Sequence, residues 1–293
     1  MRKAVIDMGT NSTRLAVAEW SDRGLQMVET KVAETRLGEG LGSECRIKPI
    51  PLARNVEAVQ QFVKRAGELG VEDIRITATS AVRDAVNKEE VKQAIGQAAG
   101  VPLEILPGEM EARLSYLGAS GDFLHWNRPL AVLDIGGGST ELVYPLKDEI
   151  HSASVNMGAV RLLEHDELRG QVDIVLRGLL AQPLPPQCAL IAVGGTNTCL
   201  MAMELGLTRY DGSKIHGQCL SKARVDAWCQ RLLSMTQEER IQIPGMKEKR
   251  ADIMPYGVLI LQQAMELLDM QEVCISDKGL VYGLLLEAFG SVG

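Results

Sequence analysis

The sequence predicts an α/β protein of two duplicated domains with a cleft between them. The first observation is a repeated phrase, AVIDMGTNSTRL at residues 4–15 and AVLDIGGGSTEL at residues 131–142. The second is that each phrase opens three strands followed by alternating helices and strands. The third is the polar segment SGDFLHWNRP at residues 120–129, which separates the two runs. We therefore expect an N-terminal domain at 1–122 and a C-terminal domain at 123–293.

In the first half, an apolar run that ends at Gly9 is typical of a buried strand. The next two strands are separated by the polar turn at residues 21–24. Apolar residues at helical spacing predict a helix over residues 51–70, which ends at a glycine. The other expected elements are strands at 12–20, 25–34, 73–80 and 101–106, helical structure at 80–100 in one or two pieces, and a helix at 107–120.

The second half repeats this pattern after Pro129. Its final helix has no sequence feature that anchors it to the second domain, so it is free to pack back on the first. The expected elements are strands at 129–136, 139–146, 149–158, 188–195 and 272–276, and helices within 159–182, from Thr196, from about 253 to 268, and at 278–290.

Composition and charge limit the class of protein. Of the 293 residues, 46% are hydrophobic and 24% are charged, as in an ordinary globular protein. The chain holds no apolar run long enough for a membrane helix, and its N-terminus lacks the pattern of a signal peptide, so we expect a cytoplasmic location and no membrane partner. The net charge of −7 argues against binding a nucleic-acid duplex. An anionic substrate would need positive charge concentrated locally.

The six cysteines form no CxxC pair. In a reducing compartment they are most simply read as small, mostly buried apolar residues, and not as a metal cluster.

Each repeated phrase has a strand, a glycine-rich turn and a second strand. Backbone N–H groups in such a turn can form an anion-binding concavity, and glycine lets the backbone approach a ligand closely. Two such turns facing each other across a cleft would hold one phosphate group from two sides. A P-loop would need GxxxxGK[ST], which the chain lacks, and the nearest match to GxGxxG, at residues 38–44, lacks the final glycine.

The repeats differ in the sign of one charge, because Arg14 takes the place that Glu141 has in the second copy. We hypothesise that the first turn supplies a cation for the substrate and the second a carboxylate for a metal ion or water. The alternative is that Arg14 is a solvated strand residue. The residues expected to bind phosphate through these turns are Asn11, Ser12, Gly136, Gly137, Gly138, Ser139 and Thr140.

These turns and IAVGGT at 191–196 resemble the superfamily of actin, sugar kinases and heat-shock chaperone ATPases. Within it, the chain resembles the exopolyphosphatase / guanosine pentaphosphate phosphatase family. Further matching segments are LGEGL (37–41), ATSAVRDA (78–85), ILPGEMEARLSYLG (105–118), MGAVRL (157–162), IPGMKEKRADIMPYG (243–257) and SDKGL (276–280). The resemblance implies two actin-like (ribonuclease H-like) domains and a metal-dependent phosphohydrolase that removes terminal phosphate from polyphosphate or guanosine pentaphosphate. The chain corresponds to a short, two-domain form.

The resemblance implies that Glu111, in GEMEA, is the catalytic general base. The alternative is a helix-capping glutamate, three residues after an N-cap at Gly108. Asp134 and Glu141 complete the predicted catalytic set and, together with Asp7, would hold Mg²⁺ or Mn²⁺.

Other family positions imply substrate contacts. Arg83 follows ATS, where Thr79 or Ser80 could cap the helix and make an anion site; the alternative is an exposed arginine. Gly194, Gly195 and Thr196 match the superfamily loop that faces a nucleotide or a distal part of the substrate. His216 is a family position, but a hydrogen-bonded structural histidine is the better reading.

The chain departs from the family pattern after SDKGL, where Val281 and Tyr282 stand in place of an expected Arg-Glu pair. This departure bears on substrate preference more than on chemistry. Rival functions are an ATPase or sugar kinase of the same fold and a non-catalytic sensor of an alarmone nucleotide. Family likeness also makes a homodimer plausible.

Overall fold

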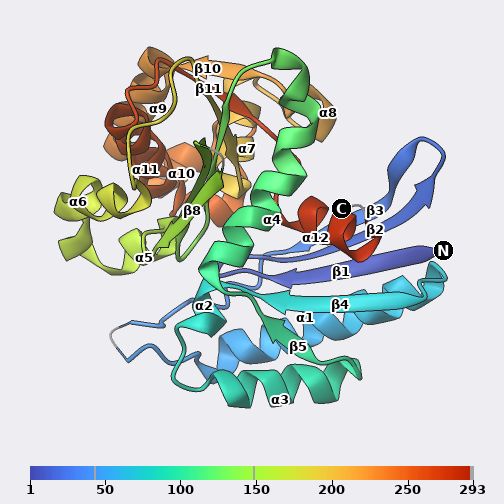
Figure 1. Cartoon of the computed structure of the whole chain (residues 1–293). Helices are drawn as coiled ribbons and strands as arrows, with labels where there is room; N and C mark the ends of the chain where they lie inside the picture. The colour runs from blue at the N-terminus through green and yellow to red at the C-terminus, as the bar shows by residue number, and fades with distance from the viewer. Residues whose placement is uncertain (43, 148, 291–293) are drawn as a thin grey trace.

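The computed structural model describes residues 1–42, 44–147 and 149–290, and each half of the chain forms one mixed β-sheet (Figure 1). The first sheet has the order β3-β2-β1-β4-β5 and the second β10-β11-β9-β6-β7-β8. The strands of the first sheet are β1 (Arg2–Met8), β2 (Thr13–Ser21), β3 (Gly24–Ala33), β4 (Asp73–Ala78) and β5 (Leu103–Ile105). Those of the second are β6 (Leu130–Ile135), β7 (Thr140–Leu146), β8 (Glu149–Val155), β9 (Ala189–Val193), β10 (Cys219–Ser221) and β11 (Glu272–Ile275).

The two sheets repeat one topology. Strand β1 pairs antiparallel with β2 and parallel with β4, and β6 pairs in the same way with β7 and β9. The predicted α/β class with two duplicated units is therefore confirmed. The last three residues of the predicted second domain, 291–293, lie outside the described part of the chain.

The helices surround these sheets. Those of the first half are α1 (Pro49–Glu68), α2 (Ser80–Arg83), α3 (Lys88–Ala99), α4 (Gly108–Ser120) and the 3₁₀ helix η1 (Gly121–Trp126). Those of the second half are α5 (Ala159–Glu164), η2 (Asp166–Gln171), α6 (Val172–Leu176), η3 (Arg177–Leu179), α7 (Gly195–Glu204), α8 (Gly212–Ile215), α9 (Lys222–Ser234), α10 (Gln237–Ile241), η4 (Glu248–Arg250), α11 (Met254–Leu267) and α12 (Leu280–Ala288). Among the described residues, no helix is long and apolar enough to cross a membrane.

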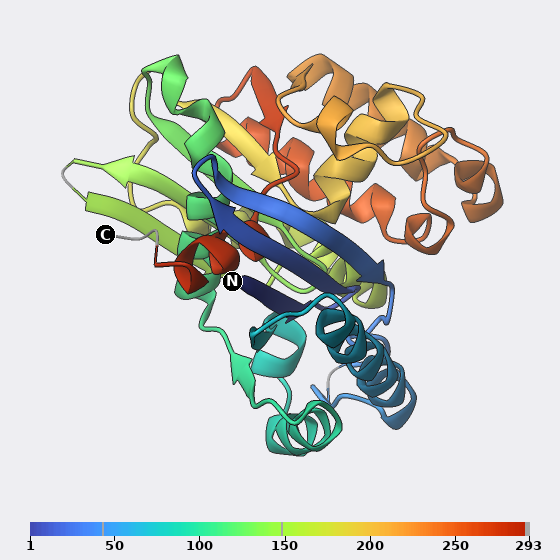
Figure 2. The same cartoon turned by 90° about the vertical axis from the view of Figure 1, so that its right-hand side faces the viewer.

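The alternation of side chains along β1 assigns its two faces. Ala4, Ile6 and Met8 are buried in a cluster with residues of α1 and α3. Val5 points to the other face, where it joins a cluster with residues of α4 and α12. Helices α1 and α3 thus cover one face of the first sheet and α12 covers the other (Figure 1, Figure 2). Asp7 shares the face of Val5.

The same alternation operates along β6. Leu133 and Ile135 pack with residues of α7, α9 and α11, whereas Leu130 and Val132 belong to a separate cluster on the opposite face. Helix α4 lies across that opposite face and contacts β6, β7, β8 and β9 (Figure 1). Asp134 shares this face, so the sheet directs its carboxylate toward α4.

The last helix of each half thus packs on the sheet of the other half, since α4 covers the second sheet and α12 the first. The two helices cross at Gly118 and Gly283. A Cβ atom on Gly283 would clash with the carbonyl oxygen of Leu114, and one on Gly118 would clash with that of Gly279. The glycines are required because the helix backbones approach so closely.

The helical stretch predicted over 80–100 is in two pieces, α2 and α3, and the helical segment predicted at 159–182 contains four short pieces. Strand β10 was not predicted, and it places Cys219 directly opposite Cys274 on β11, where the two form a disulfide. The expectation of unpaired, buried cysteines is therefore wrong for this pair. Of the four free cysteines, three are buried and Cys45 is partly exposed.

We expect Gly283→Ala to destabilise the protein by about 1–3 kcal/mol, the usual effect of overpacking a close contact. Gly67→Ala is the matched control, because a Cβ atom there meets no other atom within 4 Å and alanine is the better helix former. Urea unfolding of both variants measures the difference. A Gly283→Ala protein as stable as Gly67→Ala would show that the crossing tolerates a side chain.

Candidate active site between the two sheets

The two glycine-rich turns have the same backbone geometry. Gly9 N donates to Ser12 O, and Gly136 N donates to Ser139 O, both at 3.0 Å. The turns face each other, because a Cβ atom on Gly138 would lie 2.6 Å from Ser80 Oγ and 2.8 Å from Thr10 Oγ1. Glycine at this position therefore lets the second turn approach the first half of the chain.

A cleft of about 540 Å³ opens between these turns. Residues from both halves line it, and they include most of the predicted phosphate-binding residues, namely Asn11, Ser12, Arg14, Gly136, Gly137, Gly138, Ser139, Gly194, Gly195 and Thr196. Thr140 is an exception, because its hydroxyl donates to Met157 O at 2.6 Å instead of reaching the cleft. Arg83 also does not line the cleft but stands behind Glu111.

Three carboxylates gather near the second turn. Asp134 lies next to the end of β6 and Glu141 next to the start of β7, and the two are direct cross-strand partners. Glu111 projects from the first turns of α4 and lines the cleft with Asp134. Glu111 and Glu141 are only 7% and 1% exposed. The fold thus places three acidic groups on the face of the second sheet that α4 covers. Glu111 and Glu141 are buried and Asp134 is half-buried, and Glu141 is not among the residues that line the cleft.

Each of these carboxylates has a hydrogen-bond donor. Ser115 Oγ on α4 donates to Asp134 at 2.6 Å, and Ser154 Oγ on β8 donates to Glu141 Oε1 at 2.7 Å. The two serines carry no signal in the sequence that would have identified them, because their role depends on how α4 and β8 pack.

Arg83 Nη1 donates to Glu111 Oε2 at 2.8 Å. Arg83 is therefore neither a freely exposed arginine nor a residue that meets the cleft directly. Glu111 is not a capping residue, because the N-cap of α4 is Pro107 and the Glu111 carboxylate goes to Arg83. The expected cap by Thr79 or Ser80 is also wrong, since neither side chain caps the single turn of α2. Ser80 Oγ is buried without a partner and lines the cleft.

The buried carboxylates bind protons more tightly than usual. Burial raises the pKa of Glu141 to about 8, and the neighbouring Asp134 adds to the rise. Burial also raises the pKa of Glu111 well above its ordinary value, with a further rise from Glu141 and an opposing effect of Arg83. The pKa of Asp134 is raised by burial too. A cation between these groups would relieve their mutual repulsion.

The carboxylates offer the oxygen ligands that Mg²⁺ prefers, and Glu141 Oε2 is buried and accepts no hydrogen bond. Among the described residues, however, no three of Asp7, Glu111, Asp134 and Glu141 place oxygens within 4.8 Å of one another, so the protein without metal does not hold a preformed ligand cluster here. Asp7, the third residue predicted to hold metal, lies on the other turn. Burial raises its pKa to about 6, while Arg14 and a 3.2 Å hydrogen bond from Thr77 Oγ1 oppose the rise. Its role as a metal ligand stays a prediction.

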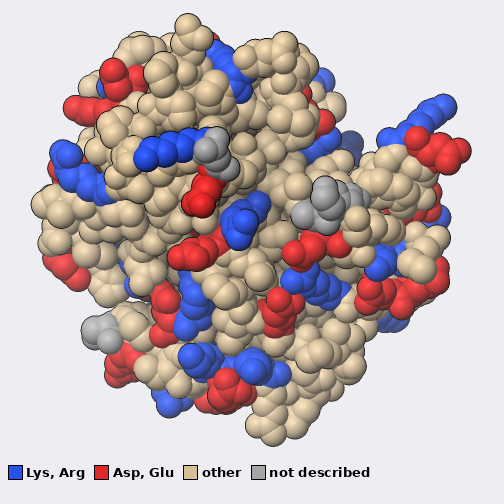
Figure 3. Space-filling model, viewed as in Figure 1, with Lys and Arg blue, Asp and Glu red and all other residues tan. Residues whose placement is uncertain are grey.

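Positive charge gathers on the other side of the cleft. On the face shown in Figure 3, basic and acidic side chains are interspersed, but Arg14, Lys247 and Arg250 all line the cleft. Arg250 is 6% exposed, and its Nη2 donates to Ser12 Oγ at 3.0 Å. Burial, and the Arg14 charge next to it, lower the pKa of Arg250.

The roles of Lys247 and Arg250 were missed from the sequence. Both lie in the segment quoted for the family resemblance, but its charges alternate as Lys-Glu-Lys-Arg at 247–250. Nothing in that alternation shows which side chains turn inward.

His216 occupies a structural position. Its Nε2 lies 3.1 Å from Asp122 Oδ2, and its Nδ1 accepts a 3.3 Å hydrogen bond from Asp277 N. The histidine thereby joins η1 to the loop that follows β11, which agrees with the reading as a hydrogen-bonded structural residue.

The two related sheets and the acidic cleft between them fit a class of α/β phosphatases. A family model described as the Ppx/GppA phosphatase family matches residues 2–291, so the chain belongs to this family. It is 31% identical over 315 residues to Exopolyphosphatase 2 of Mycobacterium tuberculosis, with 99% of each chain covered.

Solved structures agree. A protein described as exopolyphosphatase-like is 29% identical, with a TM-score of 0.91 and full coverage of both chains. The PPX-GPPA enzyme of Aquifex aeolicus is 27% identical, with a TM-score of 0.80 over 98% of this chain and 99% of that one.

The raised pKa of Glu141 predicts how metal-free stability depends on pH. Its carboxylate has a pKa of about 8 when folded and 4.5 ordinarily, so between these values the folded state holds more protons than the unfolded state. The free energy of unfolding should therefore fall by about 2 kcal/mol from about pH 6.5 to about pH 8.5.

Added Mg²⁺ should raise the melting temperature more at the higher pH, because the carboxylate then binds metal without first losing a proton. Thermal melts with Mg²⁺ and with EDTA measure both effects. Glu141→Gln is the control and should flatten the pH dependence. If Mg²⁺ raised the melting temperature of the wild-type protein equally at both pH values, this assignment would be contradicted.

Proposed function

We propose that this protein is a phosphohydrolase that releases terminal phosphate from inorganic polyphosphate, guanosine pentaphosphate or both, by metal-assisted attack of water. The observation that carries the proposal is the cleft that Glu111, Asp134, the two glycine-rich turns and the cations Arg14, Lys247 and Arg250 line together, with Glu141 buried beside Asp134. Exopolyphosphatase 2 of Mycobacterium tuberculosis, to which the chain is related along its length, supports the substrate class.

In this mechanism, Glu111 accepts the proton of the attacking water at Oε1, since Arg83 donates to Oε2. Arg83 also favours the charged form of Glu111, which a general base needs before the reaction. Arg14 and Arg250 neutralise oxygens of the substrate, and the N–H groups of the two turns hold the terminal phosphate.

Asp134 and Glu141, with Asp7 across the cleft, would hold Mg²⁺ or Mn²⁺. The ion would supply positive charge to the phosphate oxygens during the reaction. Ser115 and Ser154 keep the two carboxylates of the second turn oriented for that role.

Two rival functions use the same cleft. An ATPase or kinase of this fold would prefer ATP, and a kinase would also need an acceptor hydroxyl. A sensor of an alarmone nucleotide would bind its ligand without turnover. A homodimer, expected from family likeness, is compatible with each of them.

Phosphate release from long polyphosphate, guanosine pentaphosphate and ATP, measured side by side with and without EDTA, distinguishes these functions. We expect release from one or both of the first two and loss of activity with EDTA. Glu111→Gln should lower turnover at least about a hundredfold while substrate binding remains. Glu109→Gln is the control, because that glutamate is exposed on the same turn of α4. Glu111→Gln at more than about a tenth of the wild-type rate would remove Glu111 from the role of base.

The change of charge between the two repeats predicts opposite responses to metal. Arg14→Ala should lower kcat/KM by about tenfold to a hundredfold, the value of a charged hydrogen bond to phosphate, and Mg²⁺ should not restore it. Glu141→Ala should be partly rescued by high Mg²⁺. The charge swap of Arg14→Glu with Glu141→Arg should stay inactive, since the general base Glu111 and the metal ligand Asp134 still lie on one side only.

Rates over a matrix of Mg²⁺ and substrate concentrations measure these responses. Arg23→Ala, at an exposed turn, is the control for loss of a positive charge. If Arg14→Ala stayed within about twofold of wild type throughout, Arg14 would be a solvated strand residue.

A further inference from the structure

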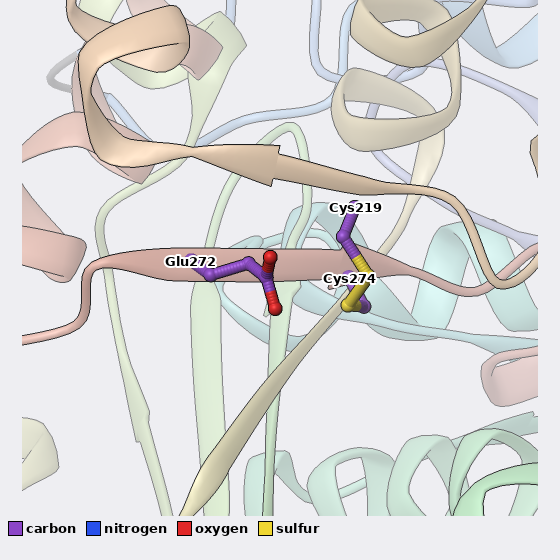
Figure 4. Close-up of side chains that lie close together, drawn as sticks. All are labelled: Cys219, Glu272 and Cys274. Carbon is purple, nitrogen blue, oxygen red and sulfur yellow. A yellow bond between two sulfur atoms is a disulfide. The ribbon is translucent and has the colours of Figure 1, made fainter.

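The disulfide between Cys219 and Cys274 joins two neighbouring strands at one edge of the second sheet. Figure 4 shows the bond between β10 and β11, with Glu272 on β11 beside it. Strand β10 is the last strand in the sheet order and has only three residues. Three residues make few ladder hydrogen bonds, so the covalent bond adds to that ladder and to the buried side chain of Leu220 in holding this edge.

The two sulfur atoms differ in access. Cys219 is exposed, whereas Cys274 is 2% exposed. An external thiolate can therefore reach the disulfide at Cys219. Three of the four remaining cysteines are buried, and burial raises the pKa of Cys188 and Cys229 to about 11, so these thiols are unreactive near neutral pH.

Glu272 favours the oxidised pair. A carboxylate oxygen of Glu272 lies within 4.8 Å of both sulfur atoms. Its negative charge disfavours thiolates at this position, and reduction above neutral pH produces thiolates. The neutral disulfide carries no such repulsion.

The disulfide lies next to the cleft along the chain. Strand β11 ends at Ile275, and Ser276, Asp277 and Lys278 then line the cleft. Gly217 N donates to Ile275 O and Ile275 N donates to Gln218 O, both at 2.8 Å. These two hydrogen bonds lie one residue beyond the disulfide. They align the segment before β10 with the start of the loop at 276–278, here called the cleft loop.

The cleft loop depends on that alignment. Asp277 N donates to His216 Nδ1 at 3.3 Å, Tyr210 hydroxyl donates to Asp277, and Lys278 Nζ lies 2.6 Å from Asp122 Oδ2. Two of the contacts, those of Tyr210 and His216, come from the segment just before β10. Loosening β10 would therefore loosen one wall of the cleft.

We propose that Cys219 and Cys274 form a reversible redox site that takes a dithiol reductant and controls the order of the loop at 276–278. This inference goes beyond the proposed function and does not depend on which phosphate substrate is cleaved.

The chemistry is thiol–disulfide exchange. A thiolate of the dithiol attacks Cys219 Sγ, forming a mixed disulfide as the bond to Cys274 breaks and Cys274 leaves and takes up a proton. The second thiol of the reductant then attacks the reductant sulfur of the mixed disulfide, and Cys219 is released as a thiol. The reductant becomes a disulfide and the protein gains two electrons and two protons; an oxidised dithiol reverses the exchange.

The test uses the full chain equilibrated in mixtures of reduced and oxidised dithiothreitol. Alkylation and mass spectrometry should show Cys219 and Cys274 gaining label together, while Cys188, Cys199 and Cys229 stay unlabelled in the folded protein. Glu272→Gln should make the disulfide easier to reduce, so the midpoint should move to a lower ratio of reduced to oxidised dithiothreitol. Cys45→Ser, the control, should leave it unchanged.

Hydrogen exchange then tests the link to the cleft. The amides of Gly217 and Ile275 should exchange about tenfold faster in the reduced protein, because the edge opens more often. Amides of β1, in the other sheet, should not change. The double variant Cys219→Ser with Cys274→Ser should exchange like the reduced protein.

Two results would overturn the proposal. If the pair does not interconvert in the folded wild-type protein, there is no redox site. If it interconverts and the two amides exchange equally in both states, the disulfide does not control the loop. Neither result requires the variants to fold or the enzyme to be active, so failure of the proposed function would be seen separately, as absence of phosphate release.

Discussion

The burial of like charges is the constraint on which this structure depends. Asp134 and Glu141 are direct cross-strand partners on one face of the second sheet, and like charges in that arrangement destabilise a sheet. Burial beneath α4 increases the cost, which is why the pKa of both groups is raised. Hydrogen bonds from Ser115 and Ser154 offset part of it, but one oxygen of Glu141 remains without a partner. The unpartnered oxygen and the raised pKa values show how much this arrangement costs the protein on its own.

The first repeat shows the same geometry with the repulsion removed. Asp7 and Arg14 are cross-strand partners on β1 and β2, in the register that Asp134 and Glu141 have on the second sheet. Opposite charges in that register attract, and Arg14 lowers the pKa of Asp7 against the effect of burial. The two copies thus share a backbone geometry, and they differ in whether the paired side chains attract or repel each other. The single difference between Arg14 and Glu141 is therefore enough to give two turns of the same backbone geometry opposite charges.

Local patterns were sufficient to predict the strands of the repeats and the two turns, and most of the predicted phosphate-binding residues line the cleft. They were insufficient wherever long-range packing decides the outcome. That Ser115 meets Asp134 depends on α4 crossing to the other sheet, and no property of its own sequence shows this. Lys247 and Arg250 lie in a segment of alternating charge, so their inward orientation follows from how η4 packs. Strand β10 is too short to give an alternating pattern, and without it the pairing of Cys219 with Cys274 could not be seen.

Two kinds of contact hold the halves of the chain together, and they have different consequences. At the crossing of α4 and α12 the contact is apolar and close, without charges that a ligand could compete for. Beside the cleft the contacts are ionic: Arg161 donates to Gly138 O and pairs with Asp84, and Arg36 pairs with Asp252. Removing either partner of such a half-buried pair leaves a charge without compensation. The crossing therefore joins the halves through shape, whereas the pairs of Arg161 with Asp84 and of Arg36 with Asp252 join them through charge.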